Sequence, residues 1–419
     1  MISLWNKVEF FAQSQAGQLA IIGVEKSYTW NELYQAVLDT AQLLTATQHN
    51  VIAFYADNCP DWVVIDLACH LSQTTLLPLP VFFSEQQLKH ALSESGATAV
   101  IHLKNDRITS LIGPSKNDDF GLGFDLTSID SNSRTLPYET TKITFTSGST
   151  GEPKGVCLSV ENQLNVALAL VDKIAINAPK HLCLLSFSTL LENVAGLYAP
   201  LLAGGTICMA PSEERGFDGA QLTNLNKLLA FISASKPQTM ILVPELLQVL
   251  LLGISKGWCP PVELEFIAVG GSLVSTKLLN KAKQAGLPVY QGYGLSECAS
   301  VVSINSKASS DSPSLNFDNQ GAGEILAHLT PEIIQGELVL TGNAFLGYLN
   351  MPESWYPQKI YTGDLVNLRG NNLEINGRKK NLLINSYGRN ISPEWPEAEL
   401  IASGIFQQVV VVGDSQPFC

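Results

Sequence analysis

The feature that most limits the possible folds is an alternation between short apolar runs and segments with helical periodicity. Apolar runs such as 51–56, 97–103 and 264–269 alternate with amphipathic segments such as 160–175 and 276–285. This spacing predicts parallel β-strands connected by helices that cover both faces of a sheet. The sequence therefore predicts an α/β fold.

Two regions depart from this alternation. Residues 105–138 are polar and rich in turn-forming residues, which indicates a loop or linker. Residues 322–376 consist of short apolar runs joined by turns, which predicts a small β-rich subdomain. The apolar run 407–412 predicts one last strand near the C-terminus. A chain of 419 residues is long enough for two or three packed units.

Composition narrows the class of protein. The formal net charge of −13 argues against nucleic acid as a partner, because phosphate backbones require clustered Lys and Arg. The eight cysteines are dispersed without a CxxC pair, which argues against disulfides or zinc and favours the cytoplasm. Residues 1–17 resemble an amphipathic helix rather than a signal peptide. The weakly charged stretch 182–211 contains Ser, Asn and Gly, so we expect a buried layer and no transmembrane segment.

The sharpest local feature follows a predicted strand that begins at Ile143. Residues 143–156 combine five Ser or Thr residues, three glycines and the single lysine Lys154. Glycines let backbone N–H groups turn toward an anion, hydroxyls add donors, and the lysine adds a positive charge. The segment therefore predicts a loop that binds phosphate groups; the alternative is a flexible surface loop. It is not a Walker loop, because no Gly-Lys-Ser/Thr occurs.

The order of these residues resembles the phosphate-loop signature of the adenylate-forming, or AMP-binding, enzymes. That signature, [ST]-[ST]-G-[ST]-[ST]-G-x-P-K-G, is filled at every position from Thr146 to Gly155. The resemblance implies that the loop holds the phosphates of ATP, with Thr146 and Lys154 as catalytic residues. The remaining ATP-binding positions of the loop are Ser147, Gly148, Ser149, Thr150 and Gly151.

A second segment, 290–297, resembles the Y-G-x-[ST]-E signature of the same family. Tyr293, followed by Gly294, offers an aromatic face to the base. Ser296 offers a hydroxyl to phosphate. Glu297 offers a hard oxygen ligand to Mg²⁺, and the resemblance implies that it is the third catalytic residue. The alternative role for Glu297 is a carboxylate placed favourably at a helix N-terminus.

Further family motifs lie before and after this segment in the expected order. The turn that resembles the adenine-contacting turn of the family consists of Gly270, Gly271 and Ser272. The Thr-Gly-Asp element ends at Asp364, whose carboxylate would accept the two ribose hydroxyls, and Arg378 would also reach the ribose. The alternatives are an ordinary solvated turn at Asp364 and a solvated charge run at 378–380.

The resemblance covers nearly the whole chain and implies both architecture and chemistry. It implies an N-terminal AMP-binding domain over residues 1–376, made of two α/β subdomains plus the β-rich subdomain. A hinge at 377–381 and the start of a truncated C-terminal domain at 382–419 would follow. The implied reaction is ATP- and Mg²⁺-dependent activation of a carboxylic acid to acyl-AMP, with release of pyrophosphate. The acyl group would then pass to a thiol of CoA or of an acyl carrier protein.

Two departures from the family pattern stand near the C-terminus. Asn381 stands where members commonly have Asp or Lys at the hinge. Residues 382–419 contain no lysine, whereas the family has one there that contacts the substrate carboxylate. We therefore expect weak adenylation by this chain. A protein that binds acyl groups or nucleotide without turnover is the alternative.

The segment 186–193 bears on the acid. Amino-acid-activating members have an Asp where this chain has Ser188, and an uncharged Ser cannot neutralise a buried ammonium group. The run 186–193, with its Glu192, resembles a stretch of the long-chain acyl-CoA synthetases. We expect the small residues Ala195 and Gly196 to leave room for an acyl tail. We therefore expect a fatty acid, with an aryl acid as the alternative. A serine hydrolase is disfavoured, since the only Gly-x-Ser-x-Gly, 253–257, follows a predicted helix rather than a strand.

Overall fold

A computed structural model describes most of the chain, and its residues gather into two compact units. The first unit comprises Met1–Pro237, Ser296–Ser300 and Ala344–Pro357; the second comprises Gln238–Leu295, Val301–Asn343 and Gln358–Cys419. The hinge expected at residues 377–381 stays a prediction. The residues that the structure describes are 4–104, 106–112, 117–131, 134–146, 153–219, 221–306, 321–384, 390–402, 405–406, 408–414 and 416.

The first unit contains an eight-stranded sheet in its described part, with the strand order β21-β9-β8-β4-β3-β5-β7-β6. Its central strands are parallel, and antiparallel strands complete both edges. The strands are β3 (Val51–Tyr55), β4 (Thr75–Leu79), β5 (Ala99–Leu103), β6 (Asn117–Gly121), β7 (Phe124–Ser128), β8 (Lys142–Thr146), β9 (Lys154–Leu158) and β21 (Gly347–Tyr348). The α/β prediction is confirmed.

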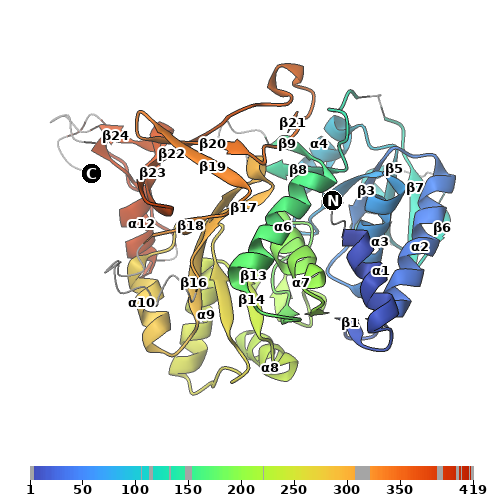
Figure 1. Ribbon diagram of the computed structural model, residues 1–419, viewed down its shortest axis with the longest axis horizontal. Helices are drawn as coiled ribbons and strands as arrows, with labels where there is room; N and C mark the ends of the chain where they lie inside the picture. The colour runs from blue at the N-terminus through green and yellow to red at the C-terminus, as the bar shows by residue number, and fades with distance from the viewer. Residues whose placement is uncertain are drawn as a thin grey trace. The chain divides into compact units, whose positions relative to one another are not determined.

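Helices surround the strands of this unit, and α1, α2 and α3 lie side by side in blue in Figure 1. Shorter strands pair in the order β10-β11-β1-β2. The helices are α1 (Leu4–Ser14), α2 (Trp30–Thr47), α3 (Pro60–Ser72), α4 (Glu85–Ser95), α5 (Arg107–Ile112), α6 (Val160–Ile174), α7 (Ala199–Leu202), α8 (Leu225–Ser235) and the π-helix η1 (Glu192–Tyr198). The shorter strands are β1 (Leu19–Ile22), β2 (Ser27–Thr29), β10 (Lys180–Leu182), β11 (Thr206–Cys208), β12 (Phe217–Asp218) and β13 (Gln221–Leu222).

Local sequence explains where several of these helices begin. At the start of α2, Thr29 accepts a hydrogen bond from the backbone of Glu32, whose side chain accepts one from the backbone of Thr29. The same reciprocal capping joins Ser159 to Asn162 at the start of α6. These pairs satisfy backbone N–H groups that have no partner within the helix.

The second unit contains a continuous run of strands in the order β19-β20-β22-β23-β18-β17-β16-β15-β14. β14, β15 and the start of β16 are parallel, whereas β18, β19, β20, β22 and β23 pair antiparallel, which confirms the β-rich region. The strands are β14 (Thr239–Leu242), β15 (Phe266–Val269), β16 (Val289–Leu295), β17 (Ser300–Ile304), β18 (Gly323–Ile325), β19 (Leu329–Ile334), β20 (Glu337–Gly342), β22 (Ile360–Arg369) and β23 (Asn372–Arg378). The helices are α9 (Pro244–Ser255), α10 (Thr276–Gln284) and α12 (Glu394–Ile401), and β24 (Leu383–Ile384) pairs with β25 (Asn390–Ile391).

Two expectations about secondary structure were wrong. Residues 105–138 were expected to be a loop, yet they contain α5 and the hairpin of β6 and β7, which extends the sheet beyond β5. Phe120, Phe124 and Leu126 are buried there, so a few apolar side chains outweigh the many turn-forming residues. A strand was expected at 407–412, but residues 408–412 are irregular.

The stretch 182–211 forms a buried layer, as expected. It contains η1 and α7, and Val194, Leu197 and Leu201 are fully buried. Among the described residues, none of the helices combines the length and the apolar character that a membrane crossing requires.

The first unit contains a buried ion pair. The Lys142 ammonium group at the start of β8 lies 2.7 Å from a carboxylate oxygen of Asp66 on α3, and both side chains are almost wholly buried. Lys142 also donates to Asn193 and Tyr198, both on η1. Tyr198 in turn donates to Asp66, and its hydroxyl lies 3.1 Å from His70. The network therefore connects β8, α3 and η1.

Removing the lysine from this network is expected to destabilise the protein strongly. Lys142→Met would leave Asp66 as a buried charge without its counterion, which costs about 3–5 kcal/mol. The control is Lys26→Met, because Lys26 pairs with Asp61 at 2.6 Å but is 42% exposed; such pairs contribute about 0–1 kcal/mol. Urea unfolding measures both, and similar losses in the two variants would contradict the argument.

His70 is expected to make stability fall in mild acid. Removal from water lowers the pKa of His70 to about 4, against the opposing effect of the Asp66 charge. A histidine in the unfolded chain has a pKa of about 6.5. Below that pH, His70 is protonated in the unfolded chain but stays neutral in the folded chain, which favours unfolding. Stability should therefore drop by about 2 kcal/mol more in the wild type than in His70→Gln between pH 7 and pH 4.5. Equal losses, measured by urea unfolding at both pH values, would show that His70 does not contribute.

Candidate active site

The predicted phosphate loop connects two paired strands. Thr146 ends β8 and Lys154 begins β9, and the two residues are direct partners in the antiparallel ladder. The Thr146 hydroxyl also donates to the Lys154 carbonyl oxygen over 3.4 Å. The hairpin therefore brings two of the three predicted catalytic residues, Thr146 and Lys154, to the base of one loop. The predicted loop positions Ser147, Gly148, Ser149, Thr150 and Gly151 lie outside the described residues.

Tyr348 connects the loop lysine to the predicted metal ligand. The Lys154 ammonium group lies 5.1 Å from the centroid of the Tyr348 ring, a cation–π distance. The Tyr348 hydroxyl donates a 2.7 Å hydrogen bond to a carboxylate oxygen of Glu297. The backbone is tied as well, because the amide of Phe345 donates to the carbonyl oxygen of Glu297 over 2.8 Å. Lys154 and Glu297, far apart in sequence, thus contact one side chain within the first unit.

The protonation state of Tyr348 suits its role as a hydrogen-bond donor to Glu297. Burial, and then the negative charge and hydrogen bond of Glu297, raise the pKa of Tyr348 well above its ordinary value. The hydroxyl therefore keeps its proton at neutral pH and donates it to Glu297. Tyr348 belongs to none of the sequence motifs. Its position follows from β21, where it pairs with Val156 beside Lys154, and this pairing has no local sequence signal.

The second unit brings together Tyr293, Asp364 and Arg378. The Asp364 carboxylate is 3% exposed, accepts a 2.5 Å hydrogen bond from the Tyr293 hydroxyl and pairs with the Arg378 guanidinium at 2.9 Å. A carboxylate offers about four lone-pair positions, so two remain for other donors. The predicted clamp is therefore held rigidly and keeps capacity to bind hydroxyl groups.

Strand pairing explains the spacing of the Asp364 and Arg378 motifs. The two residues lie directly opposite each other on β22 and β23, which form a hairpin. Glu337 on β20 contacts the neighbour of each residue: it accepts a hydrogen bond from the Gly363 amide at 2.9 Å, next to Asp364, and pairs with Lys379 at 3.2 Å, next to Arg378. Glu337 also lies outside the sequence motifs.

The predicted adenine turn follows β15 directly. Gly271 adopts a positive φ of 85°, which a side chain would strain. A Cβ atom at Gly270 would lie 3.1 Å from the carbonyl oxygen of Gly292, so this glycine permits close packing on β16. Gly271 and Ser272 are exposed. Gly294 lies next to Tyr293 on β16, whereas Ser296 begins a short 3₁₀-helix with Glu297 in the first unit.

The segment expected to contact the acid is tightly hydrogen-bonded. Ser188 is buried and donates to the carbonyl oxygen of Leu79 over 3.3 Å. Glu192 is fully buried; it lies 3.2 Å from His181 and accepts from the Leu185 amide at 3.2 Å. A Cβ atom at Gly196 would lie 2.3 Å from a Glu192 oxygen. The Glu192 side chain therefore fills the space beside Gly196, and the expected room for an acyl tail is absent there.

One other group of potential metal ligands lies close by. Atoms of His181, Cys183 and Glu192 lie within 4.8 Å of one another, and all three side chains are buried. Burial, reinforced by the charge of Glu192, raises the pKa of Cys183, so the thiol stays protonated. Both Glu192 oxygens already accept hydrogen bonds or pair with His181. The group is therefore a closed hydrogen-bonded cluster.

A family model of the AMP-binding enzymes matches residues 8–343. The chain belongs to the AMP-binding enzyme family. It is an adenylate-forming ligase, as the motifs predicted, and its α/β architecture is that of the family.

Known relatives share most of their length with this AMP-binding enzyme. It is 27% identical over 410 residues to a 2-succinylbenzoate–CoA ligase of Staphylococcus epidermidis. The matched region covers 91% of this chain and 78% of that protein. It is 26% identical over 396 residues to a feruloyl-CoA synthase of Amycolatopsis. Here the matched region covers 87% of this chain and 76% of that protein.

Solved structures share the fold of the AMP-binding enzyme. The o-succinylbenzoate coenzyme A synthetase from Bacillus subtilis, in complex with ATP and magnesium ion, matches with a TM-score of 0.76 at 21% identity, over 96% of this chain and 85% of that one. The anthranilate CoA ligase AuaEII in complex with anthranoyl-AMP matches with a TM-score of 0.81 at 15% identity, over 98% and 84%.

Glu337 is expected to matter for stability although it belongs to no motif. Glu337→Ala would leave the Gly363 amide and Lys379 without their acceptor, at a cost of about 1–3 kcal/mol. Glu332→Ala is the control, because its ion pair with Lys359 is exposed and contributes about 0–1 kcal/mol. Urea unfolding of both variants provides the comparison, and equal stability of Glu337→Ala and Glu332→Ala would refute a supporting role for Glu337.

Proposed function

We propose that this AMP-binding enzyme activates an aromatic carboxylic acid as its acyl-adenylate and passes the acyl group to the thiol of coenzyme A. The observation that carries the proposal is the contact of Lys154 and Glu297 with the same tyrosine, at the base of a fully matched phosphate loop. The CoA ligases among its relatives support the acceptor.

The proposed chemistry consists of positioning and charge neutralisation. A carboxylate oxygen of the acid attacks the α-phosphorus of ATP, the bond to the β-phosphate oxygen breaks, and pyrophosphate leaves. The Lys154 ammonium group would offset phosphate charge, and the Thr146 hydroxyl would donate to a phosphate oxygen. Glu297 would hold Mg²⁺, whose charge would further neutralise the phosphates. Its carboxylate fits this role, since Tyr348 accounts for only one of its lone-pair positions.

A cluster around Asp364 is suited to the adenosine part of ATP. We infer that Asp364 accepts the ribose hydroxyls and that Arg378 fixes the carboxylate and reaches the ribose. The hydrogen bond from Tyr293 and the ion pair with Arg378 support this inference, because they hold Asp364 in one orientation. The turn at 270–272 and the Tyr293 ring would contact the adenine.

An aromatic acid is favoured over a fatty acid for two reasons. First, 2-succinylbenzoate, ferulate and anthranilate, which appear in the names of the relatives, are all aromatic acids. Second, Glu192 fills the space beside Gly196 that a long acyl tail would need. The uncharged Ser188, bonded to the Leu79 carbonyl, continues to argue against an amino acid. The described cysteines are free thiols, which supports a cytoplasmic setting.

Pyrophosphate release measures the proposed reaction directly. With ATP and Mg²⁺, we expect release with aromatic acids such as benzoate derivatives, and none above background with fatty acids or amino acids. Release with fatty acids alone would refute the aromatic assignment. ATP binding without release with any acid would instead favour a binding protein.

Three substitutions test the site. Lys154→Ala and Glu297→Gln are expected to lower pyrophosphate release about 100-fold or more, the scale of losing one charge-stabilising group. Tyr348→Phe should lower it about 10-fold and raise the Mg²⁺ concentration needed for half-maximal rate, because Glu297 loses its positioning hydrogen bond. Tyr138→Phe is the control, since Tyr138 is 78% exposed. Unchanged rates in the Lys154 and Glu297 variants would disprove the site.

A further inference from the structure

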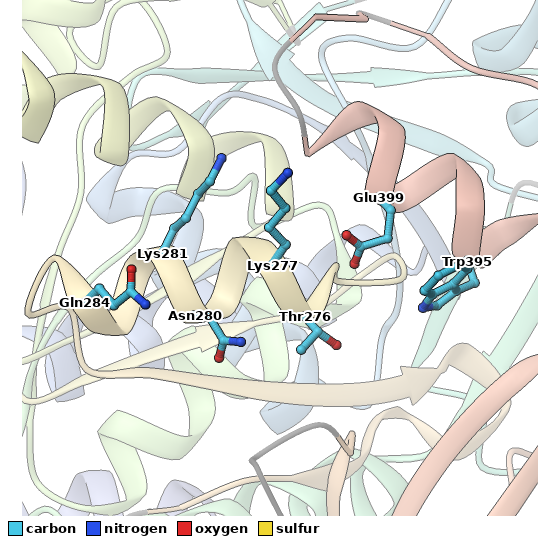
Figure 2. A pocket seen from close by; sticks show the side chains of 7 residues that line it. All are labelled: Thr276, Lys277, Asn280, Lys281, Gln284, Trp395 and Glu399. Carbon is cyan, nitrogen blue, oxygen red and sulfur yellow. The ribbon is translucent and has the colours of Figure 1, made fainter.

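A groove on the second unit is lined by none of the residues assigned above. It lies between α10 and α12 and has a volume of about 590 Å³, within the range of roughly 300–1,000 Å³ of small-molecule sites. Figure 2 shows the lining side chains, which project from the two helices. They are Thr276, Lys277, Asn280, Lys281, Gln284, Trp395 and Glu399.

The groove carries positive charge in a chain that is strongly negative. Lys277 and Lys281 are exposed, stand one helical turn apart, and extend from the same side of α10 in Figure 2. Neither amine lies within 4.0 Å of a carboxylate among the residues that the structure describes. Like charges at this spacing repel each other. An anion bound between the two amines would relieve this repulsion.

The carboxylate in the groove has a different partner. Glu399 accepts a 2.7 Å hydrogen bond from the hydroxyl of Ser275, the N-cap residue of α10. Its negative charge therefore lies at the positive end of the helix dipole. Glu399 also fixes α12 against α10, so both walls of the groove are held together. One of its oxygens remains available as an acceptor for a hydroxyl group.

Trp395 supplies an aromatic surface at one end. Its side chain is 64% exposed, and Figure 2 places the indole beyond Glu399, at the opposite end of the groove from Lys281. A ligand that matches this order has an aromatic ring, then hydroxyl groups, then phosphates. Asn280 and Gln284 add amide donors and acceptors along α10.

We propose that the groove binds a phosphorylated adenine nucleotide. The base stacks on Trp395, a ribose hydroxyl donates to Glu399, and the phosphates lie against Lys277 and Lys281. Two sources have this chemistry: the 3′-phosphoadenosine end of coenzyme A, and a free nucleotide such as ATP. The first source rests on the proposed function, because it makes the groove a site for the thiol acceptor.

Direct binding tests the groove without requiring turnover. We would titrate the full chain with adenosine 3′,5′-bisphosphate by calorimetry. Lys277→Glu combined with Lys281→Glu is expected to weaken binding at least tenfold, and Trp395→Ala several-fold. The matched control combines Lys89→Glu with Lys256→Glu, which changes the net charge equally at exposed lysines outside the groove; its affinity should equal that of the wild type.

Three results would overturn the proposal. The first is equal affinity in the wild type and the Lys277/Lys281 double variant. The second is no binding by the wild type at millimolar ligand. The third is loss of binding in Asp364→Ala with retention in the double variant, which would place the ligand at the adenosine site. Thermal unfolding identifies variants that misfold, and Trp395→Ala carries the test if the double variant does so.

Comparison of ligands separates the two sources. The coenzyme source is supported if dephospho-coenzyme A binds the wild type tenfold more weakly than coenzyme A does. This difference between the two ligands should disappear in the double variant. Equal binding of ATP supports a general nucleotide site. Pyrophosphate release does not involve this groove, so its failure would reject the proposed function and leave the binding result standing.

Discussion

The ion pair between Lys142 and Asp66 is the constraint on which the first unit depends. Two opposite charges are removed from water there and are satisfied by each other and by Asn193 and Tyr198. Such a pair gives little net stability, but breaking it leaves a buried charge without its counterion, so β8, α3 and η1 are held together. Lys142 begins β8, and Thr146 ends the same strand at the phosphate loop. The buried network thus fixes the strand from which the loop starts.

The same logic recurs in the candidate site, where carboxylates are oriented by neutral or cationic donors. Tyr348 donates to Glu297, and Tyr293 and Arg378 hold Asp364. Each carboxylate keeps lone pairs for a metal ion or for hydroxyl groups. Orientation before binding lowers the cost of ordering these groups when the nucleotide arrives. Because each donor comes from a strand or its end, the geometry depends on sheet register.

Sequence reasoning identified the α/β layers and the β-rich region, because these depend on local periodicity. It selected the motif residues from ordered signatures, and their roles stay predictions. It did not identify Tyr348 or Glu337, whose contacts join segments that are distant in the chain. It also misjudged Gly196, because the side chain that fills the adjacent space, Glu192, lies on the same π-helix and turns back upon it. The hairpin of β6 and β7 was missed because its apolar residues are few among polar ones.

The interleaving of the two units has a consequence for how the protein is made. Glu297 and Tyr348 belong to the first unit, although the segments that carry them come after the chain has already entered the second. Synthesis from the N-terminus therefore delivers β8 and β9 long before their edge strand β21. The first unit cannot be completed until residue 357 has left the ribosome, and early folding must proceed with β9 as an open edge. The contacts of Tyr348 with Lys154 and Glu297 are thus among the last parts of that unit to form.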